Sequence, residues 1–176
     1  MKKEYLDLLQ ECMANKVPHL SFKQEYQGFA KEIISDVKIV NPLTKEEREY
    51  KALWDTGATH TVITPKVLQE LNLAIVDKTT IIGVNSKNEN IPVALFDLLL
   101  VFGINISIEK IRGAVCIIGG NADILIGMDI IRFGDFSISN GGGKTLFSFA
   151  FPPFENKTDL VEKANRVNKN NKVFKK

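Results

Sequence analysis

Two patterns of hydrophobic and polar residues divide the chain. Over residues 4–14, apolar side chains recur at spacings of three and four residues, which predicts a short amphipathic helix. Its apolar positions are Tyr5, Leu8, Leu9, Cys12 and Met13. From residue 33 onward, short β-prone runs alternate with clusters of Asn, Gly, Pro and Ser, which predicts an all-β domain. The expected strands cover residues 33–40, 50–54, 59–63, 79–84, 91–101, 104–108, 114–118, 124–126, 136–139 and 145–149.

Two short helices are expected to interrupt these strands. Thr64 and Pro65 would begin one over residues 66–71, and Asp129 would cap a turn that Gly134 ends. The chain then divides into a helical N-terminal extension (1–32), the β domain (33–154) and a basic tail (155–176). The tail has seven Lys and Arg against three Asp and Glu, and its composition favours disorder or a frayed helix.

Composition narrows the classes of function. With 176 residues, the chain has room for one compact domain with modest extensions. The 23 Lys and Arg nearly balance the 21 Asp and Glu, so neither nucleic acid nor an anionic membrane is expected as the main partner. No apolar run is long enough to span a bilayer, and charges interrupt the beginning of the chain where a signal peptide would be apolar. A cytoplasmic protein is therefore expected.

The two cysteines predict neither a metal site nor a disulfide. Cys12 and Cys116 lie far apart in the sequence, and neither has a His or a second Cys at the spacing of a metal site. No metal or cofactor is therefore expected.

The stretch that carries chemistry is Asp55-Thr56-Gly57-Ala58. An apolar strand precedes it and a second β-prone run follows, so the turn displays the Asp55 carboxylate between buried elements. Gly57 permits a backbone approach that a side chain would prevent, and the Thr56 hydroxyl can hydrogen-bond a neighbouring loop. Asp-Thr-Gly is also an ordinary turn sequence, so the tripeptide alone identifies no function.

Two further elements follow the turn in a particular order. Residues 79–84 and 91–100 flank a polar tip, which predicts a hairpin. Next, the apolar run 124–126 ends at Gly127 and leads into a short helix. In this order the three elements resemble the retropepsin-like aspartic proteases, the single-lobed relatives of the retroviral enzymes. The resemblance covers roughly residues 33–154 and implies one closed β-barrel lobe per chain.

The resemblance also implies roles for particular residues. Asp55 would be the catalytic aspartate, and Thr56 and Gly57 would complete the catalytic triplet. Ala58 would adjoin the substrate, and Gly127 would support the catalytic turn. The hairpin would be the flap that closes over a bound peptide. The flap residues at the substrate would be Gly83, Val84, Asn85 and Ser86.

The sequence departs from the retroviral pattern at two positions. Retroviral members often have an acidic residue just after the triplet and an arginine after the supporting glycine, where this chain has Thr59 and Met128. The comparison implies that the ion pair bracing the retroviral dimer is absent here. The sequences at residues 127–131 and 134–136 look more like those of bacterial members of the superfamily.

A single triplet has a consequence for assembly. Peptide hydrolysis by this chemistry uses two carboxylates that share one proton, so that one accepts a proton from water while the other donates to the carbonyl oxygen. No other Asp is followed by Thr-Gly or Ser-Gly, and Asp129 and Asp135 are expected in capping or surface roles. The predicted protein is therefore an aspartic endopeptidase that forms a homodimer, pairs Asp55 with its own copy and acts on peptides or proteins.

Several alternatives stay open at this stage. The same dimer could be a binding module that holds a peptide or protein partner without cleavage, or it could hydrolyse something other than a peptide. His60 could line a substrate pocket or simply pack. The first thirty residues could form an interaction helix, an inhibitory segment or part of the dimer contact. Residues 151–154, Phe-Pro-Pro-Phe, could be a stiff end of the last strand or a site of self-cleavage.

Overall fold

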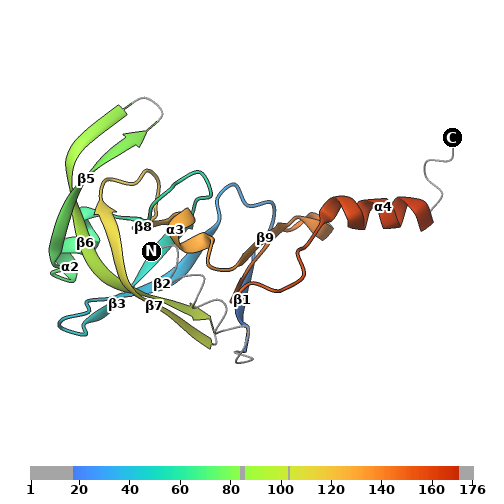
Figure 1. The fold of residues 1–176 in the computed structure, drawn as a ribbon, viewed down its shortest axis with the longest axis horizontal. Helices are drawn as coiled ribbons and strands as arrows, with labels where there is room; N and C mark the ends of the chain where they lie inside the picture. The colour runs from blue at the N-terminus through green and yellow to red at the C-terminus, as the bar shows by residue number, and fades with distance from the viewer. Residues whose placement is uncertain (1–17, 84–85, 103, 171–176) are drawn as a thin grey trace.

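The computed structural model describes residues 18–83, 86–102 and 104–170, in which strands predominate (Figure 1). The elements are β1 (Leu20–Glu25), β2 (Ile34–Val40), β3 (Glu47–Trp54), β4 (Val62–Ile63), α2 (Pro65–Glu70), β5 (Ile75–Gly83), β6 (Ser86–Phe102), β7 (Ile104–Val115), β8 (Ile124–Ile126), α3 (Met128–Ile131), β9 (Asp135–Ser139), the 3₁₀ turn η1 (Gly141–Gly143), β10 (Leu146–Phe151) and α4 (Leu160–Asn170).

Six strands close into a barrel. Neighbouring strands pair in the order β2, β3, β8, β4, β7 and β6, and β2 also pairs with β6, which returns the sheet to its first strand. Among the described strands, β5 pairs only with β6 and forms a hairpin with it that projects beyond the barrel (Figure 1). The predicted all-β class and closed barrel are therefore confirmed.

The barrel strands alternate buried and less buried side chains, as a sheet with one face on a core requires. On β6, Phe96, Leu98 and Leu100 are fully buried, whereas the residues between them are only half-buried. On β2, Val37 and Ile39 follow the same period. The long apolar runs seen in the sequence thus fill the interior of the barrel.

A second, three-stranded sheet lies beside the barrel, with the strand order β1, β10, β9. Aromatic rings join it to the barrel: Trp54, the last residue of β3, lies with its ring centroid 5.0 Å from that of Phe147 and 5.2 Å from that of Phe149. Phe22 of β1 packs against the same rings. The second sheet is therefore anchored at the residue immediately before Asp55.

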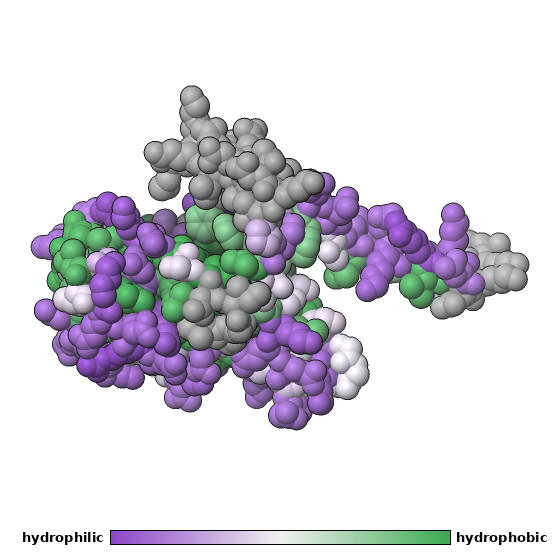
Figure 2. Space-filling model, turned by 90° about the horizontal axis from the view of Figure 1, so that it is seen from below, coloured by the Kyte–Doolittle hydropathy of each residue, from purple (hydrophilic) through white to green (hydrophobic). Residues whose placement is uncertain are grey.

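The beginning of the described chain differs from the sequence prediction, and its end takes one of the two forms that were expected. Within the extension expected to be helical, residues 20–25 form strand β1, which packs by its single buried aromatic residue, Phe22. The helix expected over residues 4–14 lies outside the described residues. In the tail, where disorder or a frayed helix was expected, residues 160–170 form α4. This helix buries no residue and stands away from the barrel with a largely hydrophilic surface (Figures 1 and 2).

Strand β7 is a single strand, although the sequence predicted two short ones at residues 104–108 and 114–118. The charged stretch between these runs continues the strand through an irregularity in its pairing with β6. There Lys110 takes a positive φ of 57°, and its N–H donates to Asp97 Oδ1 at 2.8 Å. The carboxylate of the neighbouring strand therefore binds the amide displaced by the bulge. Residues 116–118 lie beyond the end of the strand.

Both predicted short helices form, but their caps differ from the prediction. Thr64 is at the N-cap of α2, yet its side chain makes no capping hydrogen bond. Helix α3 begins after Gly127, so the prediction that Asp129 caps it was wrong. None of the helices in the described residues has the length and apolar character needed to cross a bilayer.

Candidate active site

The turn that carries Asp55 connects β3 to β4, and β8 lies between these two strands. Strand β8 runs parallel to β3, with Trp54 opposite Ile126, and antiparallel to β4. The chain therefore enters and leaves the turn on either side of one buried strand. Ile124 and Ile126 are fully buried, which fixes β8 in the barrel and gives the turn a rigid base.

Main-chain hydrogen bonds hold the turn on this base. The Asp55 N–H donates to the Ile126 carbonyl at 2.9 Å, and the Ala58 N–H donates back to the Asp55 carbonyl at 3.2 Å. The Met128 N–H donates to the Ala58 carbonyl at 2.8 Å, which joins the turn to the start of α3. The backbone of the turn is thus connected to the elements on both sides of Gly127.

The Asp55 carboxylate is held in place and remains accessible. Its Oδ1 accepts a hydrogen bond from the Gly57 N–H at 2.8 Å, and no other described residue hydrogen-bonds this carboxylate. Asp55 is half-buried, while Thr56 and Gly57 are exposed. A Cβ at position 57 would lie 3.1 Å from Oδ1, so glycine leaves room for the carboxylate to fold back onto the turn. The predicted triplet therefore presents one acid to solvent.

Gly127 lies where the backbone of the segment after the Asp55 turn approaches closely. A Cβ at this position would be 2.6 Å from the carbonyl carbon of His60 and 2.7 Å from its oxygen. Such distances are shorter than any van der Waals contact, so only glycine fits without moving the main chain. The sequence proposed a supporting role for Gly127, and its contact with His60 is consistent with that role. The His60 residue itself is exposed.

A polar pair, the buried Thr61 and the half-buried Asp129, connects the two halves of the site. The Thr61 N–H donates to Asp129 Oδ2 at 2.9 Å, and the Thr61 hydroxyl donates to Asp129 Oδ1 at 2.8 Å. The same hydroxyl accepts the Gly127 N–H at 3.2 Å. Thr61 is fully buried. Both oxygens of the Asp129 carboxylate are thus engaged in positioning the loop.

The hairpin of β5 and β6 supplies the segment expected to be the flap. Its strands pair up to Gly83 and Ser86, which lie opposite one another at the end of the ladder. Val84 and Asn85, the other two predicted flap residues, lie outside the described residues. Ile82, one residue before the end of β5, is 78% exposed. The flap end therefore carries an apolar side chain in contact with solvent.

The sequence profile of a protein family described as "gag-polyprotein putative aspartyl protease" matches residues 42–132, just over half of the chain. The match includes the Asp55 turn, the hairpin and Gly127. The chain belongs to this family. The resemblance inferred from the sequence is thereby confirmed at the level of the family.

One solved structure of an aspartic protease is also similar to this chain. It is the crystal structure of a retropepsin-like aspartic protease from Rickettsia conorii, with 18% sequence identity and a TM-score of 0.49. The similarity covers 76% of this chain and 96% of that chain. No curated protein matches the chain.

The region that matches the family profile begins after β1 and β2 and ends before β9 and β10. The matched region contains the two residues of the site that sequence analysis missed, Thr61 and Asp129. Thr61 is a polar residue in a β-prone run, which is only a weak signal, and Asp129 was assigned to capping. Their contact spans 68 positions of sequence, so no local pattern indicates it.

A hydrogen bond between two side chains, Tyr50 and Glu70, joins β3 to the helix that follows β4. Burial, together with a hydrogen bond to Glu70, raises the pKa of Tyr50, so this hydroxyl stays protonated and donates to Glu70 Oε2 at 3.0 Å. The bond joins β3 to α2. Among the described residues there is no group of three or more His, Cys, Asp or Glu side chains placed to bind a metal ion.

Proposed function

We propose that the protein is an aspartic endopeptidase that acts as a homodimer, in which the Asp55 residues of two copies activate a water molecule for peptide-bond hydrolysis. One observation carries the proposal: the Asp55 carboxylate is fixed by Gly57 on a solvent-facing turn whose backbone is bound to β8. The protease domain of the proposal spans residues 33–154, with β1 attached to it through β10.

The need for a second copy follows from the carboxylates available. Asp129 follows closely on Gly127, but both of its oxygens accept hydrogen bonds from Thr61. Asp55 has only the Gly57 N–H as a donor within the described residues. Of these two acids in the described residues, only Asp55 is uncommitted, whereas the chemistry needs two carboxylates. A two-fold axis brings Asp55 against its own copy without requiring any second motif.

The mechanism follows from two carboxylates that share one proton. Two like charges about 3 Å apart are too costly for both acids to ionise, so one stays protonated. The ionised carboxylate takes a proton from water as the water oxygen attacks the peptide carbonyl carbon, and the protonated one donates to the carbonyl oxygen. Collapse of the tetrahedral intermediate breaks the C–N bond, and the amine leaves with a proton from the pair.

Other residues of the site would orient the reactants. The exposed Thr56 hydroxyl would brace the facing turn of the partner copy. The hairpin of β5 and β6 would cover an extended peptide and exclude bulk water. Ala58 and the flap residues Gly83, Val84, Asn85 and Ser86 would then adjoin the peptide. The exposed Ile82 beside them favours substrates with apolar side chains.

Cleavage of a diverse peptide library, read by mass spectrometry, tests the proposal. Asp55→Asn should lower cleavage by about 10²–10⁴-fold, because it removes the general acid and base at once. Asp36→Asn is the matched control: this acid is on the barrel surface, paired with Lys51, and its loss should leave cleavage unchanged. Cleavage that survives Asp55→Asn would overturn the proposal. A folded dimer that binds peptides without cleaving them would favour the binding module instead.

Mixed dimers test the pairing of two aspartates. When wild-type chains and Asp55→Asn chains are mixed in equal amounts and exchange freely, about a quarter of the dimers contain two intact aspartates. Specific activity per wild-type chain should therefore fall to about half. A monomeric active unit would instead keep full activity per wild-type chain, which would contradict the shared site.

A further inference from the structure

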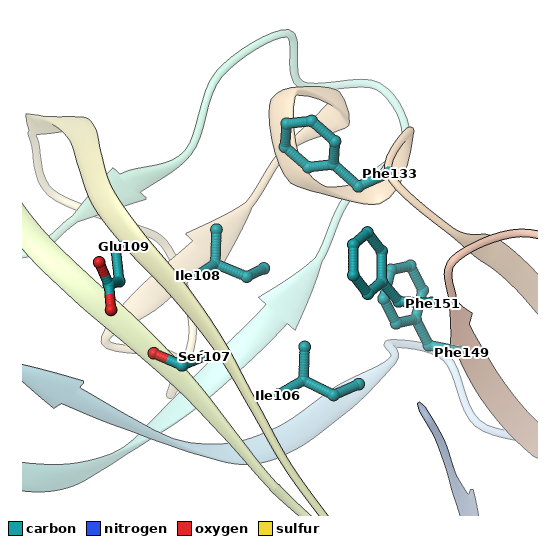
Figure 3. A pocket seen from close by; sticks show the side chains of 7 residues that line it. All are labelled: Ile106, Ser107, Ile108, Glu109, Phe133, Phe149 and Phe151. Carbon is teal, nitrogen blue, oxygen red and sulfur yellow. The ribbon is translucent and has the colours of Figure 1, made fainter. Parts of the chain in front are cut away.

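An apolar pocket of about 200 Å³ lies between β7, the segment after α3 and β10 (Figure 3). None of the residues proposed for catalysis lines it. Its walls are formed by Ile106, Ser107, Ile108, Glu109, Phe133, Phe149 and Phe151. The pocket is therefore separate from the Asp55 turn.

The inner walls of this pocket are hydrophobic and incompletely covered. Ile106 and Ile108 of β7 face the rings of Phe133, Phe149 and Phe151 across the cavity (Figure 3). Ile106 and Phe149 are already buried, whereas Ile108, Phe133 and Phe151 are only half-buried. An apolar occupant would remove the remaining surface of these three side chains from water, which is favourable.

The described chain begins at the edge of this pocket. Leu20, the first residue of β1, lies opposite Phe151 in the β1–β10 ladder, and β1 also contacts β7. Just before it, His19 Nδ1 is 2.8 Å from the Pro152 carbonyl oxygen, and the His19 ring stacks on Phe154. The residues that precede β1 therefore join the barrel where two walls of the pocket meet.

The preceding residues have the composition to fill an apolar pocket. Residues 4–14 place apolar side chains on one face of a predicted helix. The six residues 14–19 connect Met13 to Leu20 and can span up to about 20 Å. The helix is therefore tethered within reach, and a tether of this kind gives a high effective concentration compared with a separate partner.

We propose that residues 4–14 bind this pocket as an amphipathic helix of the same chain, with Leu8, Leu9, Cys12 and Met13 against Ile108, Phe133 and Phe151. Phe133 follows α3, and Gly127, which immediately precedes α3, contacts His60 after the Asp55 turn. The bound segment therefore braces the far end of the helix that supports the site. The proposal does not depend on catalysis and is tested without an activity measurement.

Disulfide trapping in the full-length protein tests where the segment binds. In a Cys116→Ser background, Ser107→Cys introduces a thiol at the exposed rim of the pocket, and native Cys12 is the only other thiol. Mild oxidation should form a bond between Cys12 and position 107 within one chain, detected by peptide mapping and by faster migration on a non-reducing gel. The matched control is Lys66→Cys on α2, at the other side of the barrel from β1 (Figure 1), which should form none.

Three results would overturn the proposal: no bond to position 107, equal yields at positions 107 and 66, or a bond that joins two chains. The third result would assign the pocket to a second copy. Hydrogen exchange gives an independent readout. Leu9→Asp places a charge on the apolar face and should speed exchange in residues 106–109 and 147–151. Gln10→Asp introduces the same side chain one position along, on the polar face, and should not. Equal exchange in these two variants would also contradict the proposal.

Discussion

The turn that carries Asp55 and the sheet of β1, β10 and β9 are both held against the barrel, but by different contacts. Main-chain hydrogen bonds and the close approach of Gly127 to His60 fix the turn. Aromatic rings around Trp54 fix the sheet. The backbone of the turn cannot shift without breaking its hydrogen bonds. The packed rings of the sheet can instead adjust their rotamers. We therefore expect the turn to be intolerant of a single added methyl group and the aromatic contacts of the sheet to accept conservative exchanges.

The largest effect is expected for Gly127→Ala. The new Cβ would lie within 3.0 Å of three backbone atoms of His60, so the segment between the Asp55 turn and β4, or α3, must move. Overpacking of this kind should lower the free energy of unfolding by about 3 kcal/mol, measured by urea denaturation. Gly141→Ala is the matched control, because no atom lies within 4 Å of its added Cβ. Similar losses in both variants would show that the close approach at Gly127 is not the cause.

Thr61→Val should have the next largest effect. The substitution keeps the shape of the side chain but removes the hydroxyl that donates to Asp129 and accepts from Gly127. It therefore leaves the buried Gly127 N–H and one oxygen of the half-buried Asp129 carboxylate short of a partner. The free energy of unfolding should fall by about 2 kcal/mol, and peptide cleavage should fall with it. Thr61→Ser restores the hydroxyl and should recover most of both losses. Failure of serine to restore stability would mean that the methyl group, and not the hydrogen bonds, holds the loop.

On the sheet side, Phe136→Leu should be milder than either change at the turn. Phe136 is half-buried, and its ring centroid lies 6.1 Å from that of Trp54 and 5.1 Å from that of Phe147. Leucine still packs an apolar side chain against these rings. The free energy of unfolding, measured in urea as before, should therefore fall by about 1 kcal/mol. If Phe136→Leu lowered the free energy of unfolding as much as Gly127→Ala, the sheet would be as rigidly fixed as the turn. The proposed difference between the two regions would then be wrong.

The sequence predicted the parts of the site that depend on neighbouring residues. The Asp55 turn, the apolar strand at residues 124–126 and Gly127 at its end each lie in a short motif, and each is found where expected. The hairpin was predicted from two β-prone runs and a polar tip, although β5 and β6 extend further than those runs. Local pattern was therefore sufficient to find the Asp55 turn, its supporting strand and the hairpin of β5 and β6.

What the sequence missed depends on contacts between distant residues. Strand β1 carries one buried aromatic, Phe22, and is a strand because β10 pairs with it. Strand β7 continues through charged residues because Asp97 on β6 binds the Lys110 amide. The assignment of Asp129 to capping was wrong because its partner, Thr61, is 68 positions away. In each case a partner on another element determines the structure, and no local periodicity records that partner.

The smallest effect is expected at the edge of the three-stranded sheet, where Lys144 Nζ lies 2.9 Å from Glu25 Oε1. The hydrogen bond from Lys144, with its positive charge, lowers the pKa of Glu25 in the folded state. A lowered pKa stabilises the fold above the ordinary Glu pKa, and this contribution is lost as the pH falls through the folded value. Lys144→Gln should therefore lower the melting temperature slightly at pH 7, and the difference from wild type should shrink as the pH falls below the ordinary Glu pKa. Added salt should reduce the difference at pH 7, because the pair is exposed. A difference that stays constant down to pH 3 would mean that Lys144 acts through packing, and that side-chain charge plays no part in holding this sheet.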